Sequence, residues 1–160
     1  MPSIVFSEGF ITVSAIILAT IFTAAVVTNL QQMSYIQVAM TQNIKDRIST
    51  KVEIVFVTVD NDTVYIWIKN TGLNHIPHDL ISRGDVYWGR KGAEQYISYN
   101  ASTPPKWLYT AVNDVDNDGY WDPGETILIT VYTGTTQSAG DYHAVYTTYN
   151  GVETEYNIAV

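Results

Sequence analysis

No charged side chain occurs between Gly9 and Ile44 of this chain. The first part of that run, Gly9 to Val27, has 19 residues and is apolar apart from a few hydroxyl groups. At about 1.5 Å per residue, a helix of this length matches the hydrocarbon core of a bilayer, which is about 30 Å thick. The sequence therefore predicts a membrane anchor helix over residues 1–29. Its large apolar side chains are Phe10, Ile11, Ile16, Ile17, Leu18, Ile21, Phe22, Val26 and Val27.

The anchor is expected to stay on the mature chain. A secretory leader requires basic residues before its apolar run and a small-residue cleavage site after it. The only charged side chain before Gly9 is that of Glu8, and no Ala-x-Ala sequence follows the run. We therefore expect an uncleaved anchor that begins at Met1 or Pro2. The alternative is a cleaved leader that releases a soluble product.

A helical stalk is predicted over residues 30–50. Beyond Val27 the apolar side chains recur three or four residues apart, and no Pro or Gly occurs between Phe10 and Gly72. Two interpretations of this stripe remain open. Its apolar residues either pack against a neighbouring helix, as in a filament or coiled coil, or lie against the chain's own domain. The residues in question are Met33, Ile36 and Met40.

Residues 51–160 carry the pattern of β-strands separated by turns. The expected strands cover residues 51–59, 63–69, 85–88, 96–99, 107–111, 126–133, 141–149 and 153–160. Seven or eight antiparallel strands at this spacing are typical of an immunoglobulin-like β-sandwich. The predicted fold class is thus a transmembrane α-helix followed by an all-β antiparallel sandwich. Asn150-Gly151, before the last strand, predicts a two-residue type I′ hairpin turn.

The composition of the β region argues for protein contacts and against nucleic acid. All eight Lys and Arg and fifteen of the sixteen acids lie in residues 45–160, so this region carries 8 − 15 = −7 charges. Nucleic-acid binding needs clustered basic side chains. Charged residues make up only 15% of the chain, whereas Tyr and Trp are abundant. This composition indicates either a protein interface or a normal sandwich core together with an adaptation to acidic surroundings, where carboxylates lose their charge.

Two features of the sequence predict opposite orientations of the anchor. Lys45 and Arg47 follow the span, which by the positive-inside rule favours a cytoplasmic C-terminus. Two N-glycosylation acceptors, Asn61 and Asn100, instead favour an external domain. We expect the domain outside.

An acidic loop offers ligands for a hard cation. Residues 114–125 satisfy the calcium-loop pattern D-x-[DN]-x-[DN]-G-x5-E, and Gly119 allows the sharp turn. Strands rather than helices flank the loop, unlike in an EF-hand. The alternative is a solvated acidic turn with Trp121 in the core. The candidate calcium ligands are Asp114, Asp116, Asp118, Asp122 and Glu125.

Enzyme activity is not expected. The chain has no Cys, no glycine-rich phosphate loop and no G-x-S-x-G elbow. His75 and His78 flank Pro77 and lack a third nearby partner, which disfavours a zinc site.

Three segments resemble the archaellum family that includes flagellar proteins G and F and the archaellins. They are Ser7-Glu8 followed by the uncharged helix, Ile68-Lys69-Asn70-Thr71-Gly72, and Trp121-Asp122-Pro123-Gly124-Glu125-Thr126. The absence of a basic residue before Gly9 favours the G or F type over the processed filament subunits.

The resemblance implies a non-enzymatic stator component of the archaellum motor. Its helix would cross the cytoplasmic membrane once, and its sandwich would lie in the pseudoperiplasm. The implied partners are a sibling G or F protein, the S-layer protein, and other copies of the chain in a homo-oligomer or filament. The last strand is the first candidate for the contacting edge. The residues of this candidate interface are Glu153, Glu155, Tyr156, Ile158 and Val160.

Two other functions stay open. An adhesive, pilin-like filament subunit with a helical core would have Phe10 as its mature N-terminus. A surface module that binds calcium or carbohydrate would need stacked aromatic side chains beside the acidic loop.

Overall fold

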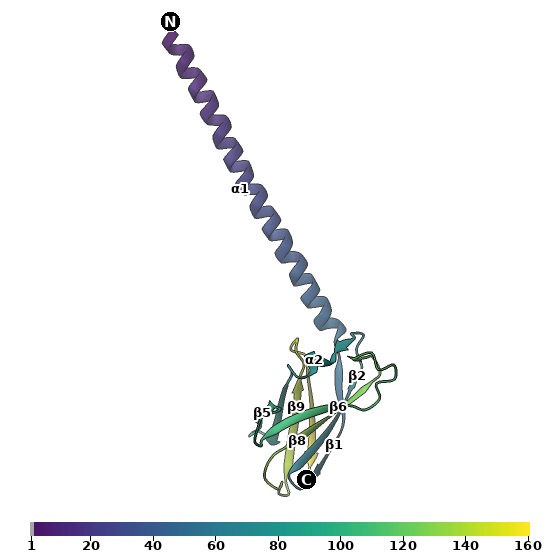
Figure 1. Cartoon of the computed structure of the whole chain (residues 1–160). Helices are drawn as coiled ribbons and strands as arrows, with labels where there is room; N and C mark the ends of the chain where they lie inside the picture. The colour runs from purple at the N-terminus through teal and green to yellow at the C-terminus, as the bar shows by residue number, and fades with distance from the viewer. Residues whose placement is uncertain (1) are drawn as a thin grey trace. The chain divides into compact units, whose positions relative to one another are not determined.

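The computed structural model describes the backbone of residues 2–160 and the side chains of residues 8–160. It contains one long helix, α1, over Pro2–Ser49, followed by β-strands (Figure 1). The chain forms two compact units, and the second begins at Ile44. The last turn of α1 therefore belongs to the same unit as the strands. The predicted mature N-terminus, Met1 or Pro2, falls outside the described side chains.

Helix α1 satisfies its own polar groups along the predicted anchor. Every hydroxyl side chain between Gly9 and Val27 donates to the backbone carbonyl four residues earlier, as in Thr20 to Ile16 at 2.8 Å. Such bonds remove the cost of a free hydroxyl in hydrocarbon. The described side chains up to Lys45 are all exposed. By length and composition this helix can cross a membrane.

The second unit holds ten strands and one short helix. The strands are β1 (Val52–Asp60), β2 (Thr63–Asn70), β3 (Ile76–Pro77), β4 (Asp85–Arg90), β5 (Gln95–Tyr99), β6 (Lys106–Ala111), β7 (Tyr120–Trp121), β8 (Thr126–Tyr132), β9 (Asp141–Thr147) and β10 (Glu153–Ala159). Helix α2 spans His78–Ile81. The eight longer strands lie at or near the predicted positions, whereas β3, β7 and α2 were not predicted.

The strands form a two-layered, immunoglobulin-like sandwich, as predicted. The order along the main sheet is β1-β2-β8-β6-β5-β4-β9-β10, and β3 pairs with β7. All pairings are antiparallel except that of β5 with β6, which covers only two residue pairs. We describe β1-β2-β8-β6 as the first layer and β5-β4-β9-β10 as the second.

The core lies between the two layers. In β2, Val64, Ile66 and Ile68 are buried and alternate with the half-buried Tyr65 and Trp67. The largest wholly buried side chains come from both layers and the loops: Trp107, Trp121, Tyr146, Ile66, Ile68, Ile76, Ile81, Ile127 and Ile129. Alternation of this kind is what a strand with one inward face produces.

The prediction of a type I′ turn at Asn150-Gly151 was wrong. Only Gly151 has a positive φ, of 79°, whereas a type I′ turn needs two such residues. Thr148 and Val152 close the loop, with the Thr148 amide donating to the Val152 carbonyl at 2.8 Å, and the Gly151 amide donates to the Thr148 carbonyl at 2.9 Å. The hairpin is thus a three-residue loop that ends in a left-handed glycine.

Candidate functional site

Five polar side chains fix the last turn of α1 to the sandwich. We call Asp46, Thr50, Asn74, Tyr149 and Asn150 the helix-end clamp. The two carboxylate oxygens of Asp46 accept from the Tyr149 hydroxyl and the Asn74 amide, both at 2.8 Å. The buried Thr50 hydroxyl accepts from the amides of Asn74 and Asn150, both at 2.9 Å. The clamp therefore joins the helix end to two loops that follow far along the chain.

Burial and the Asp46 carboxylate raise the pKa of the Tyr149 hydroxyl to about 12. Burial is the larger cause, because it disfavours the phenolate. The carboxylate accepts the phenolic proton and would repel a phenolate charge. The clamp hydrogen bond is thus retained throughout the neutral range.

Gly72 allows close backbone contact at the same place. A Cβ built on Gly72 would lie 2.5 Å from the Lys51 nitrogen and 2.6 Å from the Ser49 oxygen. Around it, the amides of Thr71 and Leu73 donate to the carbonyls of Lys51 and Ser49 at 2.9 and 2.8 Å. Only glycine leaves room for these two bonds.

Asn70, which is wholly buried, links the two motifs of the β region among the three segments that carried the family resemblance. Its side-chain amide donates to the carbonyls of Trp121 and Asn74, both at 2.8 Å. Its side-chain oxygen accepts from the amide of Gly72 at 3.0 Å. The backbone of Asn70 also forms hydrogen bonds with the backbone of the segment around Gly124. The first motif thus meets the second at Asn70, and Asn74 continues the contacts into the helix-end clamp.

The acidic loop gathers three of its five candidate ligands. Carboxylate oxygens of Asp114, Asp116 and Asp118 lie within 4.8 Å of one another. Two of these residues also fold the loop, since Asp114 accepts from the Asn117 amide at 2.6 Å and Asp118 from the Tyr120 amide at 2.9 Å. These oxygens are the ligand type that calcium prefers.

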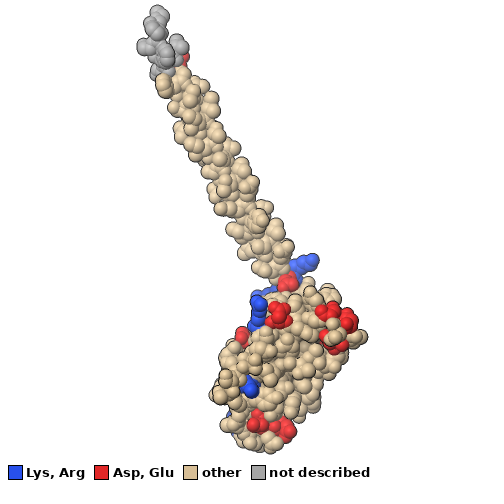
Figure 2. Space-filling view, in the orientation of Figure 1, with Lys and Arg blue, Asp and Glu red and all other residues tan. Residues whose placement is uncertain are grey.

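The other two candidate ligands have partners of their own. The buried Glu125 carboxylate accepts from the amides of Val115 and Asp122 at 3.1 and 2.9 Å. The Asp122 carboxylate lies 2.6 Å from Nδ1 of His75. In the structure, both therefore bind groups of the protein rather than joining the three aspartates. Figure 2 shows acidic side chains gathered over the loop between β6 and β8.

The candidate interface strand β10 lies beside β1. The Ile54 amide of β1 donates to the Thr154 hydroxyl of β10 at 3.1 Å. Tyr156 and Ile158 point inward and pack on the core, whereas Glu153 and Glu155 point outward. Val160 is partly exposed at the chain end. The apolar part of the predicted interface therefore contributes to the domain's own core.

The remaining predicted site residues lie at exposed positions. Asn61 and Asn100 sit in turns with positive φ, of 55° and 46°, and are exposed as glycosylation acceptors must be. The anchor side chains from Phe10 to Val27 and the stalk residues Met33, Ile36 and Met40 are exposed along α1. Exposed apolar side chains on all faces suit a lipid or protein environment rather than water.

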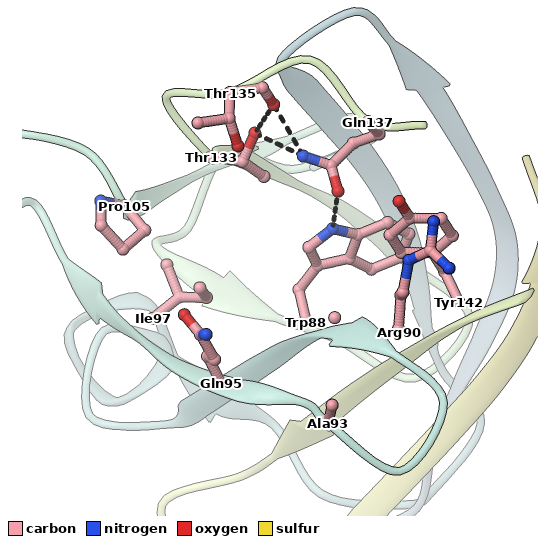
Figure 3. Close-up of a pocket in the computed structure, with 11 residues that line it drawn as sticks. Trp88, Arg90, Ala93, Gln95, Ile97, Pro105, Thr133, Thr135, Gln137 and Tyr142 are labelled. Carbon is pink, nitrogen blue, oxygen red and sulfur yellow. Dashed lines mark hydrogen bonds between the residues drawn. The ribbon is translucent and has the colours of Figure 1, made fainter. Parts of the chain in front are cut away.

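A hollow of about 450 Å³ opens between β4, β5 and residues 133–137 (Figure 3). Its floor is the stacked pair Trp88 and Tyr142, whose ring centroids are 5.2 Å apart. The Gln137 amide bridges the Trp88 indole and the Thr133 hydroxyl, at 3.3 and 3.0 Å. No carboxylate or imidazole lines this hollow, nor does any residue of the acidic loop. The stacked pair Trp88 and Tyr142 therefore shares no hollow with the predicted calcium ligands.

Sequence reasoning missed the helix-end clamp. Its members are spread from Asp46 to Asn150, and no periodic pattern connects them. The one signal available was the cluster of turn residues after β2, which includes Asn74. Such residues often bond backbone groups, but their partners are fixed only by the fold.

Known proteins resemble this chain along almost its whole length. The sequence model of the archaeal-type flagellin family matches residues 3–158. An uncharacterized protein of Archaeoglobus fulgidus is 23% identical over 154 residues, which cover 92% of this chain and 93% of that protein.

Two solved structures share the sandwich fold. The archaellum periplasmic stator protein FlaG from Sulfolobus acidocaldarius matches with a TM-score of 0.59 at 24% identity, over 68% of this chain and 99% of that chain. The stator complex of FlaF and FlaG from the same organism matches with a TM-score of 0.58 at 24% identity, over 68% of this chain and 89% of that chain.

Proposed function

This chain belongs to the archaeal-type flagellin family, and on that premise we propose that it is a membrane-anchored, non-enzymatic stator component of the archaellum motor. Helix α1 crosses the cytoplasmic membrane once, and the sandwich lies outside, in the pseudoperiplasm. The sandwich holds a sibling protein of the F or G type and the S-layer. The shared fold with FlaG supports this role.

The observation that carries the proposal is the helix-end clamp. A stator must transmit force between its membrane anchor and the domain that binds its partners. Asp46 and Thr50 are held by side chains from two different loops, and beside Gly72 the Leu73 amide donates to the Ser49 carbonyl. The last turn of α1 is therefore part of the sandwich rather than a flexible linker, which suits a connection that transmits force.

Sibling binding is the second part of the proposal. A complex of FlaF and FlaG is among the solved structures that match this fold. Affinity purification of a tagged full-length chain from detergent-solubilised archaeal membranes tests it. We expect a sibling archaellum protein and the S-layer protein in the eluate. Purification without either, from cells that assemble archaella, would contradict the proposed partners.

The side of the membrane can be tested by chemical labelling. The chain has no native Cys, so Asn157→Cys on the exposed face of β10 introduces a single thiol. A maleimide that cannot cross membranes should label this thiol in intact cells as fully as in lysed cells. Labelling that requires lysis would place the sandwich in the cytoplasm and overturn the proposal. A cytoplasmic cysteine protein serves as the control for intact membranes.

A filament subunit is the second candidate. The exposed apolar residues of α1 that continue beyond the 19-residue span, such as Met33 and Met40, favour it, because a helical filament core would cover them. Mass spectrometry of the mature N-terminus separates the two functions. The stator predicts Met1 or Pro2, and the filament subunit predicts Phe10.

A further inference from the structure

The two outer faces of the sandwich differ in charge. On the second layer, acidic side chains point outward from three neighbouring strands: Asp85, Asp141, Glu153 and Glu155. On the first layer, two successive cross-strand rows contain no charged side chain. One row is Phe56, Trp67, Leu128 and Thr110, and the next is Thr58, Tyr65, Thr130 and Leu108. We call the outward side of β1, β2, β8 and β6 the neutral face.

A β-bulge adds to the apolar surface of the neutral face. Ile54 pairs with Ile68 and Phe56 with Trp67, so Val55 is an extra residue in β1. Simple alternation from Ile54 would turn Phe56 into the core, but the bulge turns it outward. Val55 is 47% exposed and Phe56 is 53% exposed. The Phe56 ring packs on Trp67, with centroids 5.4 Å apart.

Charge limits which surface a second copy of the chain can use. Residues 45–160 carry 8 − 15 = −7 charges, so two sandwiches repel each other at most approaches. If two copies met through their second layers, the acidic side chains of one copy would face those of the other. Contact through the neutral face avoids this repulsion. This face also presents Phe56, Tyr65 and Trp67, and aromatic residues of this kind anchor interfaces.

We propose that the neutral face binds the neutral face of a second copy, sheet on sheet, about a two-fold axis parallel to the strands. Such an axis, between β2 and β8, lays β2 over β8 of the copy and β1 over β6. Trp67 then faces Leu128 of the copy, and Thr58 faces Leu108. Packed sheets with nearly aligned strands are a common arrangement of this kind.

The charges at the ends of the neutral face select this axis. Asp60 and Lys106 lie at opposite edges of one row, which also contains Thr63 and Tyr132. The proposed axis sets Asp60 against Lys106 of the copy, twice in each dimer. An axis perpendicular to the strands would instead lay β1 on β1 and set Asp60 against Glu53. Only the parallel axis gives complementary charges.

Cysteine pairs test the contact, because the chain has no native Cys. We would prepare the full chain in detergent with Thr58→Cys and Leu108→Cys together. Facing sheets lie about 10 Å apart with Cβ atoms closer, so a thiol crosslinker about 8 Å long reaches across. Within one chain these positions are three strand spacings apart, about 14 Å, which exceeds that reach. We expect crosslinked dimers from the double variant and almost none from either single variant.

A matched control uses the acidic face. Tyr96→Cys with Glu155→Cys occupies the same arrangement on the second layer, at the two ends of one row across β5, β4, β9 and β10. This pair should give no more dimer than a single variant. Equal crosslinking of both pairs, or none from Thr58→Cys with Leu108→Cys, overturns the proposal. The proposal is also overturned if the reagent, applied to cell membranes, crosslinks this chain only to a different protein.

Charge reversal tests the same contact without altering its packing. In the Thr58→Cys, Leu108→Cys background, Asp60→Lys should lower the dimer yield about tenfold, because it sets like charges together twice. Adding Lys106→Asp should restore the yield. A yield that does not respond to Asp60→Lys, or that Lys106→Asp fails to restore, contradicts the proposed axis. The dimer is independent of the motor role, so loss of sibling binding in cells does not affect this result.

Discussion

The carboxylate of Asp46, in the last turn of α1, accepts a hydrogen bond of 2.8 Å from the hydroxyl of Tyr149, 103 residues later in the chain. Tyr149 lies in the loop between β9 and β10, so this bond attaches the helix end to the last hairpin of the sandwich. Asn150 of the same loop reaches Thr50. The final turn of α1 is therefore held by tertiary contacts rather than by helix propensity alone.

Tyr149→Phe should weaken the sandwich in a pH-dependent way. The pKa of Tyr149 is raised to about 12 from an ordinary value of 10. A raised pKa stabilises the folded state below pH 10, and this contribution is lost as the pH rises from 10 through 12. At pH 7 the free energy of unfolding of the variant should be lower by about 1 kcal/mol. This is the contribution of one hydrogen bond to a partly exposed carboxylate such as that of Asp46.

The measurement is urea unfolding in detergent, followed by Trp fluorescence. All four Trp lie in residues 51–160, so the signal reports the sandwich. The difference between wild type and Tyr149→Phe should shrink between pH 10 and 12. A difference that stays constant over this interval would show that the hydroxyl does not contribute as described.

Gly72→Ala should be more damaging than a glycine substitution elsewhere. Its methyl group would lie 2.5 and 2.6 Å from the backbone atoms of Lys51 and Ser49, which cannot move away as a flexible side chain can. We expect a loss of more than about 2 kcal/mol in the free energy of unfolding. Gly151→Ala is the control, because it has open space but a positive φ, and should cost about 1 kcal/mol. Equal losses would contradict the close contact at Gly72.

Asn70→Ala should cost about 3 kcal/mol. It removes the partners of the Trp121 and Asn74 carbonyls and of the Gly72 amide, and it leaves a cavity in a wholly buried position. The exposed Asn157→Ala provides the comparison, with an expected change below about 0.5 kcal/mol. Thermal melting of both variants is sufficient, and similar melting temperatures would disprove the linking role of Asn70.

Calcium binding by the acidic loop stays a prediction with a direct test. If Asp114, Asp116 and Asp118 hold the ion, millimolar calcium should raise the melting temperature by about 5 °C, because a ligand bound only by the folded state stabilises it. Asp116→Asn should reduce this shift, and it breaks no hydrogen bond that the Asp116 side chain makes in the described structure. An unchanged melting temperature near neutral pH would remove the prediction.

The helix and the longer strands were predictable because their signals are local and strong. The run without charge fixes α1, and alternating apolar residues fix strands such as β2 and β8. Strands β3 and β7 have two residues each, which is too short for any periodicity. In β1 the bulge at Val55 breaks the alternation, so the outward position of Phe56 follows from pairing with Trp67 and not from its own pattern.

The functional contacts were less predictable, because they join distant segments. The motifs around Asn70 and Trp121 were recognised separately, but their meeting depends on how β2 and β8 pair. The acidic loop offered five candidate calcium ligands, yet the fold brings together three of them, and the Glu125 carboxylate accepts from backbone amides instead. Spacing in the sequence determines which residues of a strand face the same side. The tertiary structure determines which residues they contact.

Swimming of archaeal cells tests the central claim, that the chain serves the archaellum motor through a helix end fixed to the sandwich by the helix-end clamp. Cells that lack this chain would be complemented with the wild type or with a chain carrying a flexible Gly-Ser segment inserted between Thr50 and Lys51. The insertion keeps the helix and the strands but separates the helix end, up to Thr50, from the strand that follows it. We predict that both chains reach the membrane in equal amounts and that only the wild type restores swimming. Full swimming with the insertion, or normal swimming without the chain, would contradict the account.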